Sequence, residues 1–212
     1  MTEGPGLLVM DVDSTLIEQE VIELIAERAG TRELVAEVTA RAMRGELDFA
    51  ASLRERVATL AGVPQGVFAE VLAEVRPTQG AAELIEALHA RGCRVGVVSG
   101  GFEEVVVPLA ERLGIDHVAA NRLEVVEGRL TGRVMGRIVD RQEKVRCLRT
   151  WAQQDGVPME RTIAVGDGAN DLGMLEAAGL GVAFCAKPVV VEQADAAIHV
   201  RDLRAVLQLI GG

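Results

Sequence analysis

An apolar run near the N-terminus ends abruptly in acidic and hydroxyl residues. Residues 7–10 read Leu-Leu-Val-Met and precede Asp11, Asp13, Ser14 and Thr15. A run of this length is typical of a buried parallel strand, and open α/β sheets bind ligands at the carboxyl ends of such strands. Two carboxylates placed there cost free energy unless a cation or a phosphate chemistry makes use of them. The alternative is a turn that caps a helix, and this segment alone does not decide between the two.

The rest of the chain repeats the pattern of short apolar runs. Four further runs predict strands at residues 95–98, 162–165, 181–184 and 196–200. Helical periodicity predicts helices between and after the later runs, at residues 81–90, 102–113, 141–154, 171–178 and 203–210. Strands that alternate with helices predict an α/β fold with a doubly wound, mostly parallel, Rossmann-like sheet.

Residues 17–75 break this alternation. Helical patterns follow one another there without a strand, at residues 18–29, 32–43, 49–60 and 64–75. Gly30, Gly45 and Gly62 end the first three, and Asp48 is a candidate N-cap of the third. We therefore expect a helical cap domain of residues 17–75 inserted after the first strand of a core domain made of residues 1–16 and 76–212.

One further segment departs from the strand–helix alternation. Residues 121–134 alternate between apolar and polar side chains and turn at Glu127-Gly128. This pattern predicts a β-hairpin in addition to the sheet.

Composition limits the partners of this chain. The net charge of −10 would repel nucleic acid and anionic membranes, and 2% aromatic residues offer few platforms for stacking bases. A small anionic substrate stays possible, because a metal ion can reverse the local field.

Cys93, Cys147 and Cys185 show no CxxC spacing, which is typical of reduced thiols. No apolar stretch approaches a membrane span of ~18–20 residues and no positive region precedes the first run, so we expect a cytoplasmic protein. We expect a monomer or a homodimer, between which the sequence does not decide.

The loop at residues 166–171, Gly-Asp-Gly-Ala-Asn-Asp, follows another apolar run and carries a second acidic cluster. In an α/β sheet this loop can meet Asp11 and Asp13 at one crevice. Asp11 and Asp167 would then be oxygen ligands of a hard cation, and few protein carboxylates completed by water and phosphate are typical of Mg²⁺. The alternative is a helix N-terminus capped by Asp167 and Asn170, although an ordinary cap needs only one such group.

Two further positions complete the polar set. Ser99 precedes Gly100 and Gly101, and a hydroxyl beside free backbone N–H groups can cradle an anion, although Ser-Gly-Gly is also a common turn. Lys144 and Lys187 are the two lysines of a chain with 20 arginines. Because the chain otherwise uses arginine, a lysine at position 144 indicates that a compact point charge is needed there. The alternative is that Lys144 is a solvated side chain on a helix. The chain contains no GxxxxGK[ST] phosphate-binding loop.

These elements, in this order, resemble the four motifs of the haloacid dehalogenase-like phosphohydrolases, namely residues 11–15, Ser99, Lys144 and residues 166–171. Within that superfamily the chain is most similar to the phosphoserine phosphatase family. The resemblance covers nearly the whole chain and includes cap segments at residues 17–20, 41–45 and 48–56. Some bacterial members carry an extra N-terminal regulatory domain. We expect this chain to lack it, because the first strand begins within a few residues of Met1.

The resemblance implies distinct roles for the paired acids. Asp11 would be the nucleophile that forms an aspartyl-phosphate. Asp13 would be the proton donor to the leaving oxygen, and would then activate water for the second half of the reaction. Mg²⁺ would be held by the Asp11 carboxylate, the Asp13 backbone carbonyl and Asp167.

The resemblance also implies how the phosphate is bound. Ser99, the Gly100 N–H and Lys144 would cradle the phosphoryl oxygens, which also makes Lys144 part of the catalytic set. Asn170 would hydrogen-bond the substrate phosphate. Asp171 would orient Lys144 or a metal-bound water without touching the phosphate itself.

Substrate choice is expected to come from the cap. The resemblance implies that Glu20 binds the ammonium of phosphoserine and that Arg56 binds its carboxylate. Met43 and Phe49 would close the site against water. Taken singly, the two charged residues could equally be solvated, and the two apolar ones could be cap core.

The implied reaction is the Mg²⁺-dependent hydrolysis of O-phosphoserine, a small-molecule substrate, to serine and phosphate, which is the last step of serine biosynthesis. Two alternative reactions are open. One is the transfer of the phosphoryl group from phosphoserine to another hydroxyl, and the other is the hydrolysis of a different small phosphomonoester. A third alternative is a non-catalytic small-molecule binder. Paired carboxylates facing phosphate argue against the binder, which has no need of them.

Overall fold

The computed structural model describes residues 4–43 and 46–211, without the side chain of Met43. Within these residues the centre of the fold is a seven-stranded sheet of order β4-β3-β2-β1-β5-β6-β7. All neighbouring strands pair in parallel except β3 and β4. The strands are β1 Leu7–Met10, β2 Arg94–Phe102, β3 His117–Val126, β4 Arg129–Met135, β5 Thr162–Gly166, β6 Leu180–Phe184 and β7 Ala196–Ile198. The doubly wound, mostly parallel α/β sheet predicted from the sequence is confirmed.

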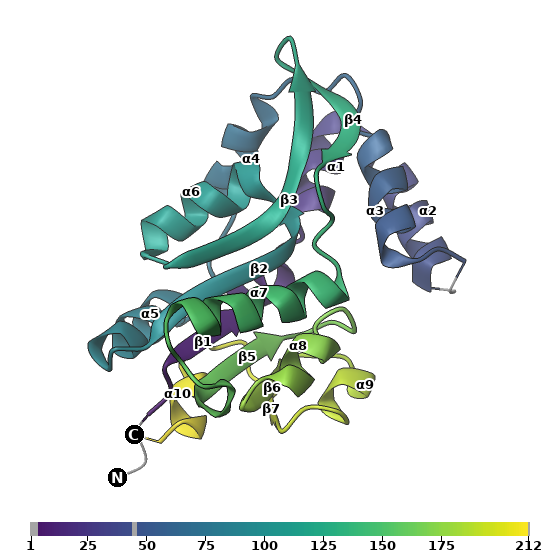
Figure 1. Ribbon diagram of the computed structural model, residues 1–212. Coiled ribbons are helices and arrows are strands. Elements are labelled where there is room, and N and C mark those ends of the chain that lie inside the picture. Colours follow the sequence, from purple (N-terminus) through teal and green to yellow (C-terminus); the bar gives the residue numbers. More distant parts are fainter. Residues whose placement is uncertain (1–3, 44–45, 212) are drawn as a thin grey trace.

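Helices occupy the connections between these strands except for the turn that joins β3 and β4, and α7 and α8 lie in front of the sheet in Figure 1. Between β1 and β2 run α1 Val21–Ala29, α2 Arg32–Met43, α3 Phe49–Ala58, α4 Val67–Glu74 and α5 Ala81–Ala90. The later helices are α6 Glu103–Leu113, α7 Arg141–Gln154, α8 Leu172–Ala177, α9 Pro188–Val191 and α10 Ala205–Leu209. The prediction of consecutive helices after the first strand is therefore confirmed. The predicted helix end at Gly45 lies outside the described residues.

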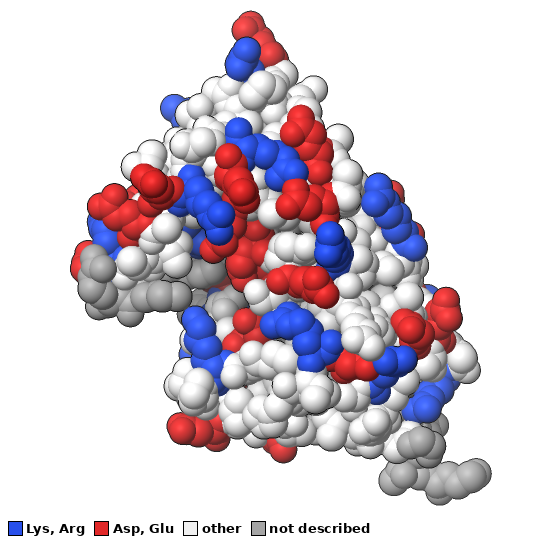
Figure 2. Space-filling view, turned by 180° about the vertical axis from the view of Figure 1, so that it is seen from behind, with Lys and Arg blue, Asp and Glu red and all other residues white. Residues whose placement is uncertain are grey.

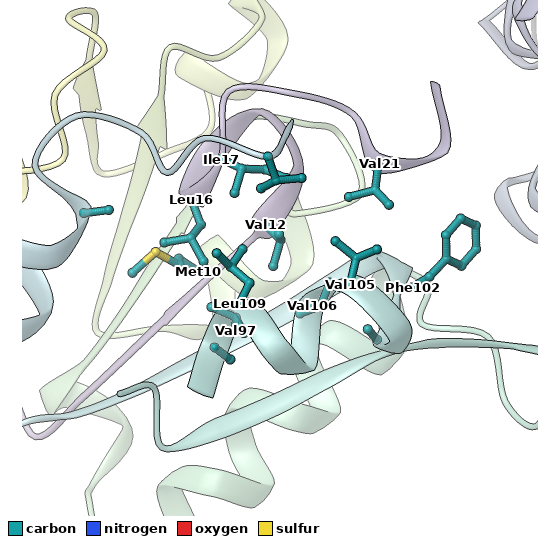
Figure 3. Close-up of a cluster of buried hydrophobic side chains, with 14 of the residues drawn as sticks. Met10, Val12, Leu16, Ile17, Val21, Val97, Phe102, Val105, Val106 and Leu109 are labelled. Atoms are coloured by element: carbon teal, nitrogen blue, oxygen red, sulfur yellow. The ribbon is translucent and has the colours of Figure 1, made fainter. Parts of the chain in front are cut away.

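The central strand β1 is covered on both faces, because side chains alternate along a strand. Leu8 and Met10 join a buried cluster with side chains of α5 and α6, part of which is drawn in Figure 3. Leu7 and Val9 join a second cluster with side chains of α7 and α8. A strand buried on both faces has to be apolar throughout, which accounts for the uninterrupted run in the sequence.

Helix α1 begins three residues later than the sequence pattern predicts. Residues 17–20 are held in an extended path instead: Glu18 N donates to Arg76 O over 3.1 Å, and Ile17 forms a bridge with Pro77. These contacts join the segment that leads into the inserted helices to the segment that leads back to the sheet. The periodicity of residues 18–29 does not indicate them. As a result Glu20 lies at the N-cap of α1, with extended backbone.

The hairpin predicted over residues 121–134 is present, and it turns at Glu127-Gly128. Beyond the prediction, the first part of β3 pairs in parallel with β2, so the hairpin extends the sheet. Its tip reaches the α3–α4 connection (Figure 1): Gly62 N donates to Leu130 O over 2.7 Å, and Gln65 N donates to Gly128 O over 2.9 Å. The helices after β1 are therefore fastened to the sheet through the hairpin as well.

The structure also shows where charged side chains lie on one face and in what state the cysteines are. Figure 2 shows Lys and Arg side chains interspersed with Asp and Glu over one face of the molecule. Cys93, Cys147 and Cys185 are free. Among the described residues, no helix combines the length and the apolar character needed to cross a membrane.

Candidate active site

A cavity of about 530 Å³ lies at the carboxyl ends of β1, β2 and β5, and residues of α1, α2 and α3 line its other side. Of the site residues predicted from the sequence, those lining it are Asp11, Asp13, Glu20, Phe49, Arg56, Gly100, Asp167 and Asn170. Three further predicted residues do not line the cavity and are wholly buried behind its lining, namely Ser99, Lys144 and Asp171. The side chain of Met43 lies outside the described residues. The structure therefore brings segments far apart in the sequence to one crevice.

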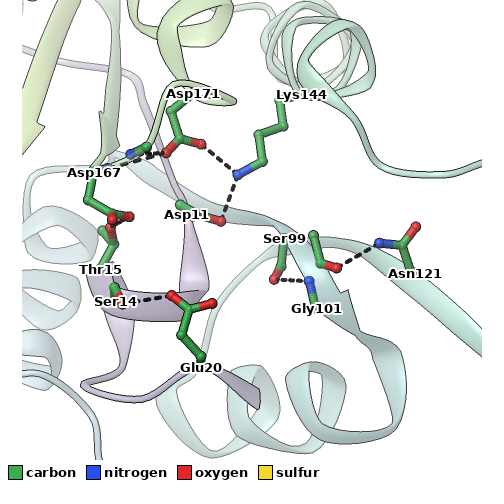
Figure 4. A network of polar contacts seen from close by, with 12 residues as sticks. Asp11, Ser14, Thr15, Glu20, Ser99, Gly101, Asn121, Lys144, Asp167 and Asp171 are labelled. Carbon is green, nitrogen blue, oxygen red and sulfur yellow. Dashed lines mark hydrogen bonds and ion pairs between the residues drawn. The ribbon is translucent and has the colours of Figure 1, made fainter. Parts of the chain in front are cut away.

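Behind the lining of the cavity, a buried cation lies between two acids. Lys144 Nζ lies 2.7 Å from Asp11 Oδ1 and 2.6 Å from Asp171 Oδ1, as Figure 4 shows. Burial by itself lowers the pKa of Lys144, but Asp11 and Asp171 together raise it above its ordinary value. The ammonium therefore stays charged and holds a fixed position beside Asp11.

Helix α7 places Lys144 at this position. Asp140 caps the helix, since its carboxylate accepts a hydrogen bond of 2.9 Å from Glu143 N. Leu148 and Trp151 follow Lys144 at intervals of four and three residues, so all three lie on one helix face. That face is buried against the sheet, where Trp151 also stacks on His117 with ring centroids 5.2 Å apart. Apolar packing of the later turns thus drives a charged side chain into the interior.

Burial, and to a smaller extent the crowding of carboxylates, raises the pKa values of the acids at this site. Burial raises the pKa of Asp11 to about 8, with Asp171 adding to the effect and Lys144 opposing it. Burial also raises the pKa of Asp167 to about 6, and the pKa of Asp13 well above its ordinary value with a further contribution from Glu20. A buried cluster of this kind favours either protonation or a bound cation.

Three of these acids can hold a metal ion. Asp11, Asp167 and Asp171 each offer a carboxylate oxygen, and these oxygens lie within 4.8 Å of one another. Asp171 is already engaged, because Oδ1 pairs with Lys144 and Oδ2 accepts hydrogen bonds from Asp167 N and Gly168 N. Asp11 and Asp167 are therefore the freer oxygen donors, and an oxygen-lined acidic site suits a hard divalent cation.

The end of β2 forms another part of the core side of the cavity, next to the end of β1. Ser99 Oγ accepts a hydrogen bond of 2.8 Å from Gly101 N, and Gly100 O accepts one of 2.8 Å from Asn121 Nδ2. A Cβ at Gly100 would lie 2.9 Å from the ring of Phe49, so a larger residue there would crowd the cavity. Asn121 is buried and fixes this strand end from β3, a role for which the sequence alone gives no sign.

The cap side of the cavity carries both signs of charge. Burial raises the pKa of Glu20, an effect that a hydrogen bond from Ser14 opposes. Arg56 is half-buried, and burial lowers its pKa while Glu20 and Asp13 oppose that shift. An arginine retains its charge in any case, so the site offers a carboxylate and a guanidinium to a ligand bound at Asp11.

Sequence reasoning gave no role to several residues that the structure places at the site. Thr15 Oγ1 donates to Asp167 Oδ1 over 3.1 Å. Arg141 lines the cavity and lies over Gly173, where a Cβ would be 3.1 Å from the Arg141 Nε. Lys187, which follows the strand at residues 181–184 and so could approach the crevice, does line it. Thr15 lies two residues after Asp13, and this closeness to the paired acids is the signal that the sequence offers for it.

Comparisons with known proteins agree with this site. The chain matches the model of the haloacid dehalogenase-like hydrolase family over residues 8–176. It is 54% identical to the phosphoserine phosphatase of Streptococcus thermophilus over 99% of this chain and 98% of that protein. It is 61% identical to the phosphoserine phosphatase of Streptomyces coelicolor, covering 97% of this chain and 50% of that protein.

Solved structures lead to the same group. A phospho-aspartyl intermediate analogue of phosphoserine phosphatase superposes with a TM-score of 0.92 at 45% identity, covering 98% of this chain and 100% of that chain. A substrate-bound phosphoserine phosphatase complex gives a TM-score of 0.92 at 44% identity, covering 98% and 99%. The fold and the four-motif site define a haloacid dehalogenase-like hydrolase, and the chain belongs to that family. Within the family it groups with the phosphoserine phosphatases.

Proposed function

We propose that this chain hydrolyses O-phosphoserine to serine and phosphate through an aspartyl-phosphate formed on Asp11. The observation that carries the proposal is the position of Asp11, 2.7 Å from the buried ammonium of Lys144, in a cavity whose opposite side offers Glu20 and Arg56. The relative from Streptococcus thermophilus, named a phosphoserine phosphatase, supports the same substrate.

The chemistry follows from the placement of the two acids. Asp11 attacks phosphorus, so that a bond from its carboxylate oxygen forms as the ester P–O bond breaks. Asp13 donates a proton to the leaving serine oxygen, and its raised pKa suits a proton donor. In the second half of the reaction Asp13 takes a proton from water, which attacks the same phosphorus and releases Asp11. Lys144 stays charged throughout and stabilises negative charge on the phosphoryl group.

We propose Mg²⁺ as the divalent cation, with Asp11, Asp167 and the backbone carbonyl of Asp13 as its protein ligands. The donor set fits, because the carboxylate oxygens of Asp11 and Asp167 lie within 4.8 Å of each other, and Asp13 lines the same cavity. When bound, the ion neutralises charge between the carboxylates and the phosphoryl oxygens. Asp171 orients Lys144 and the Asp167 loop instead of binding the ion directly.

Substrate binding is divided between the two sides of the cavity. We assign the phosphoryl group to Ser99, the Gly100 N–H, Lys144 and Asn170. Glu20 takes the ammonium of the serine moiety and Arg56 takes its carboxylate in a bidentate contact. Phe49, which lies against Gly100, and Met43 close the site against water.

We also propose the domain division into a core of residues 1–16 and 76–212 and a cap of residues 17–75. The hydrogen bonds between the α3–α4 connection and the hairpin mean that the cap would move together with the hairpin tip.

The enzyme is proposed to act in the cytoplasm as a monomer or homodimer, completing serine biosynthesis. Size-exclusion chromatography with light scattering measures the oligomeric state.

A panel of phosphomonoesters, assayed with Mg²⁺ and with EDTA, tests the function. We expect kcat/KM for phosphoserine to exceed that for an aryl phosphate by about 100-fold, because polar groups built to bind the serine moiety are left unpaired otherwise. EDTA should abolish turnover. Serine release in excess of phosphate release would indicate transfer to an added hydroxyl acceptor. Equal activity on every ester, or no turnover by folded protein, would overturn the proposal.

A further inference from the structure

Ser14 has an unusual backbone conformation for a residue with a side chain. Its φ is 58° and its ψ is 1°, within the left-handed region. A Cβ disfavours this region, and such residues persist where surrounding contacts impose the conformation, often at functional sites. Ser14 lies between the paired acids and Thr15, in the turn Val12–Leu16 that follows β1.

Three hydrogen bonds hold Ser14 in place. Its backbone N donates to Gln19 O over 3.2 Å, and its carbonyl oxygen accepts from Arg201 Nη1 over 3.0 Å. Its hydroxyl donates to Glu20 Oε1 over 2.8 Å, as drawn in Figure 4. Ser14 is therefore held by residues of the segment that enters the cap and by Arg201, which belongs to the C-terminal part of the core.

The hydroxyl contact determines how Glu20 is presented. Glu20 is the first residue before α1 and lines the same cavity as Asp13. A single hydrogen bond to one carboxylate oxygen restricts rotation of the carboxyl group and favours its ionised form over the protonated form. An oriented and ionised carboxylate is what recognition of a substrate ammonium requires.

We propose that Ser14 is a positioning residue for substrate recognition, whose left-handed backbone directs its hydroxyl to Glu20 and so orients that carboxylate toward the ammonium of the substrate. This inference rests on the proposed function, in which Glu20 binds the ammonium of the substrate. It predicts that Ser14 contributes to discrimination between substrates with and without the amine, separately from the chemistry at Asp11.

Two variants separate the hydroxyl from the backbone. Ser14→Ala keeps a Cβ in the left-handed region and removes only the hydroxyl. Ser14→Gly removes the hydroxyl and also relieves the backbone, so it is expected to fold at least as well as the native protein. Each is assayed with phosphoserine and with 3-(phosphonooxy)propanoate, the analogue in which hydrogen replaces the amine.

We expect both variants to reduce the ratio of kcat/KM for phosphoserine over the analogue by about tenfold, the size of one hydrogen bond to a charged group. The loss should lie in KM for phosphoserine, while the analogue is turned over nearly as before. An unchanged ratio in both variants would overturn the inference. Loss in Ser14→Ala with a native ratio in Ser14→Gly would also overturn it, since backbone strain would then be the cause.

Glu20→Gln keeps this test distinct from the proposed function. If Glu20 reads the ammonium, this variant loses the preference, and adding Ser14→Ala to it produces no further loss. If Glu20→Gln retains the preference, the proposed ammonium recognition fails, and the inference about Ser14 fails with it. If Glu20→Gln loses the preference while both Ser14 variants keep it, only the inference about Ser14 is wrong.

Discussion

The ammonium of Lys144 lies 2.7 Å from Oδ1 of Asp11, and the two side chains are 0% and 8% exposed. Asp171 contacts the same ammonium from the other side, at 2.6 Å. One buried cation therefore compensates two buried acids, while Asp167 adds a third carboxylate nearby. This imbalance sets how the site responds to mutation, metal and pH.

Removing the cation should destabilise the fold. Lys144→Met leaves Asp11 and Asp171 buried without their counter-charge, which costs about 3–5 kcal/mol in the free energy of unfolding. The loss should be greatest at pH 8 and smaller at pH 5, where protonation of Asp11, whose pKa burial raises to about 8, removes one of the buried negative charges. Urea unfolding at both pH values measures it. A variant as stable as the native protein at pH 8 would contradict the assigned role of the buried ion pairs.

Arg56 is expected to act on substrate binding. Arg56→Ala should raise KM for phosphoserine by about 10- to 100-fold, because it removes hydrogen bonds to a charged group. KM for an aryl phosphate, which has no carboxylate in that position, should change little. Arg54→Ala is the matched control, since Arg54 is exposed on the same helix, α3. Equal effects of Arg56→Ala on both substrates would rule out carboxylate recognition.

Thr15 is expected to support the metal site through Asp167. Thr15→Val keeps the shape of the side chain and removes the hydrogen bond of 3.1 Å to Asp167 Oδ1. Loss of a partner that orients a metal ligand should weaken Mg²⁺ affinity about 10-fold or more. Calorimetric titration measures the affinity, with Thr150→Val, an exposed site on α7, as the control. Native Mg²⁺ affinity in Thr15→Val would show that Asp167 is held by other contacts.

The metal-free protein should lose stability as pH rises. The folded pKa values of Asp11, about 8, and of Asp167, about 6, lie above the ordinary value of 3.8. Between pH 4 and 8 the folded state therefore holds more protons than the unfolded state, so the free energy of unfolding falls with increasing pH. Mg²⁺ binds the deprotonated acids and should raise Tm more at pH 8 than at pH 6. Asp167→Asn should diminish this difference, and equal increases at both pH values would refute the linkage.

Local signals in the sequence account for the strands and motifs that could be predicted. The run at residues 7–10 is apolar on both faces because β1 lies at the centre of a doubly covered sheet. The polar residues that interrupt such runs mark the strand ends, and parallel strands bring those ends together. Asp11, Ser99 and Asp167 could therefore be assigned to one crevice before the fold was known.

Features that depend on tertiary contacts have no comparable local pattern in the sequence. Residues 117–120 lack a distinct pattern, and their pairing with β2 is set by the sheet itself. Residues 18–20 have helical periodicity but are drawn into an extended path by the bond from Glu18 to Arg76. The left-handed backbone of Ser14 likewise depends on partners distant in sequence, such as Arg201.

Peptide mapping after acid quenching tests the central claim most directly. During turnover of phosphoserine, the native enzyme should carry a phosphoryl group on the peptide that contains Asp11. Asp11→Asn should carry none and should turn over less than about one per cent of the native rate, with an unchanged circular dichroism spectrum. A phosphoryl group on a different residue, or substantial turnover by folded Asp11→Asn, would show that Asp11 is not the nucleophile.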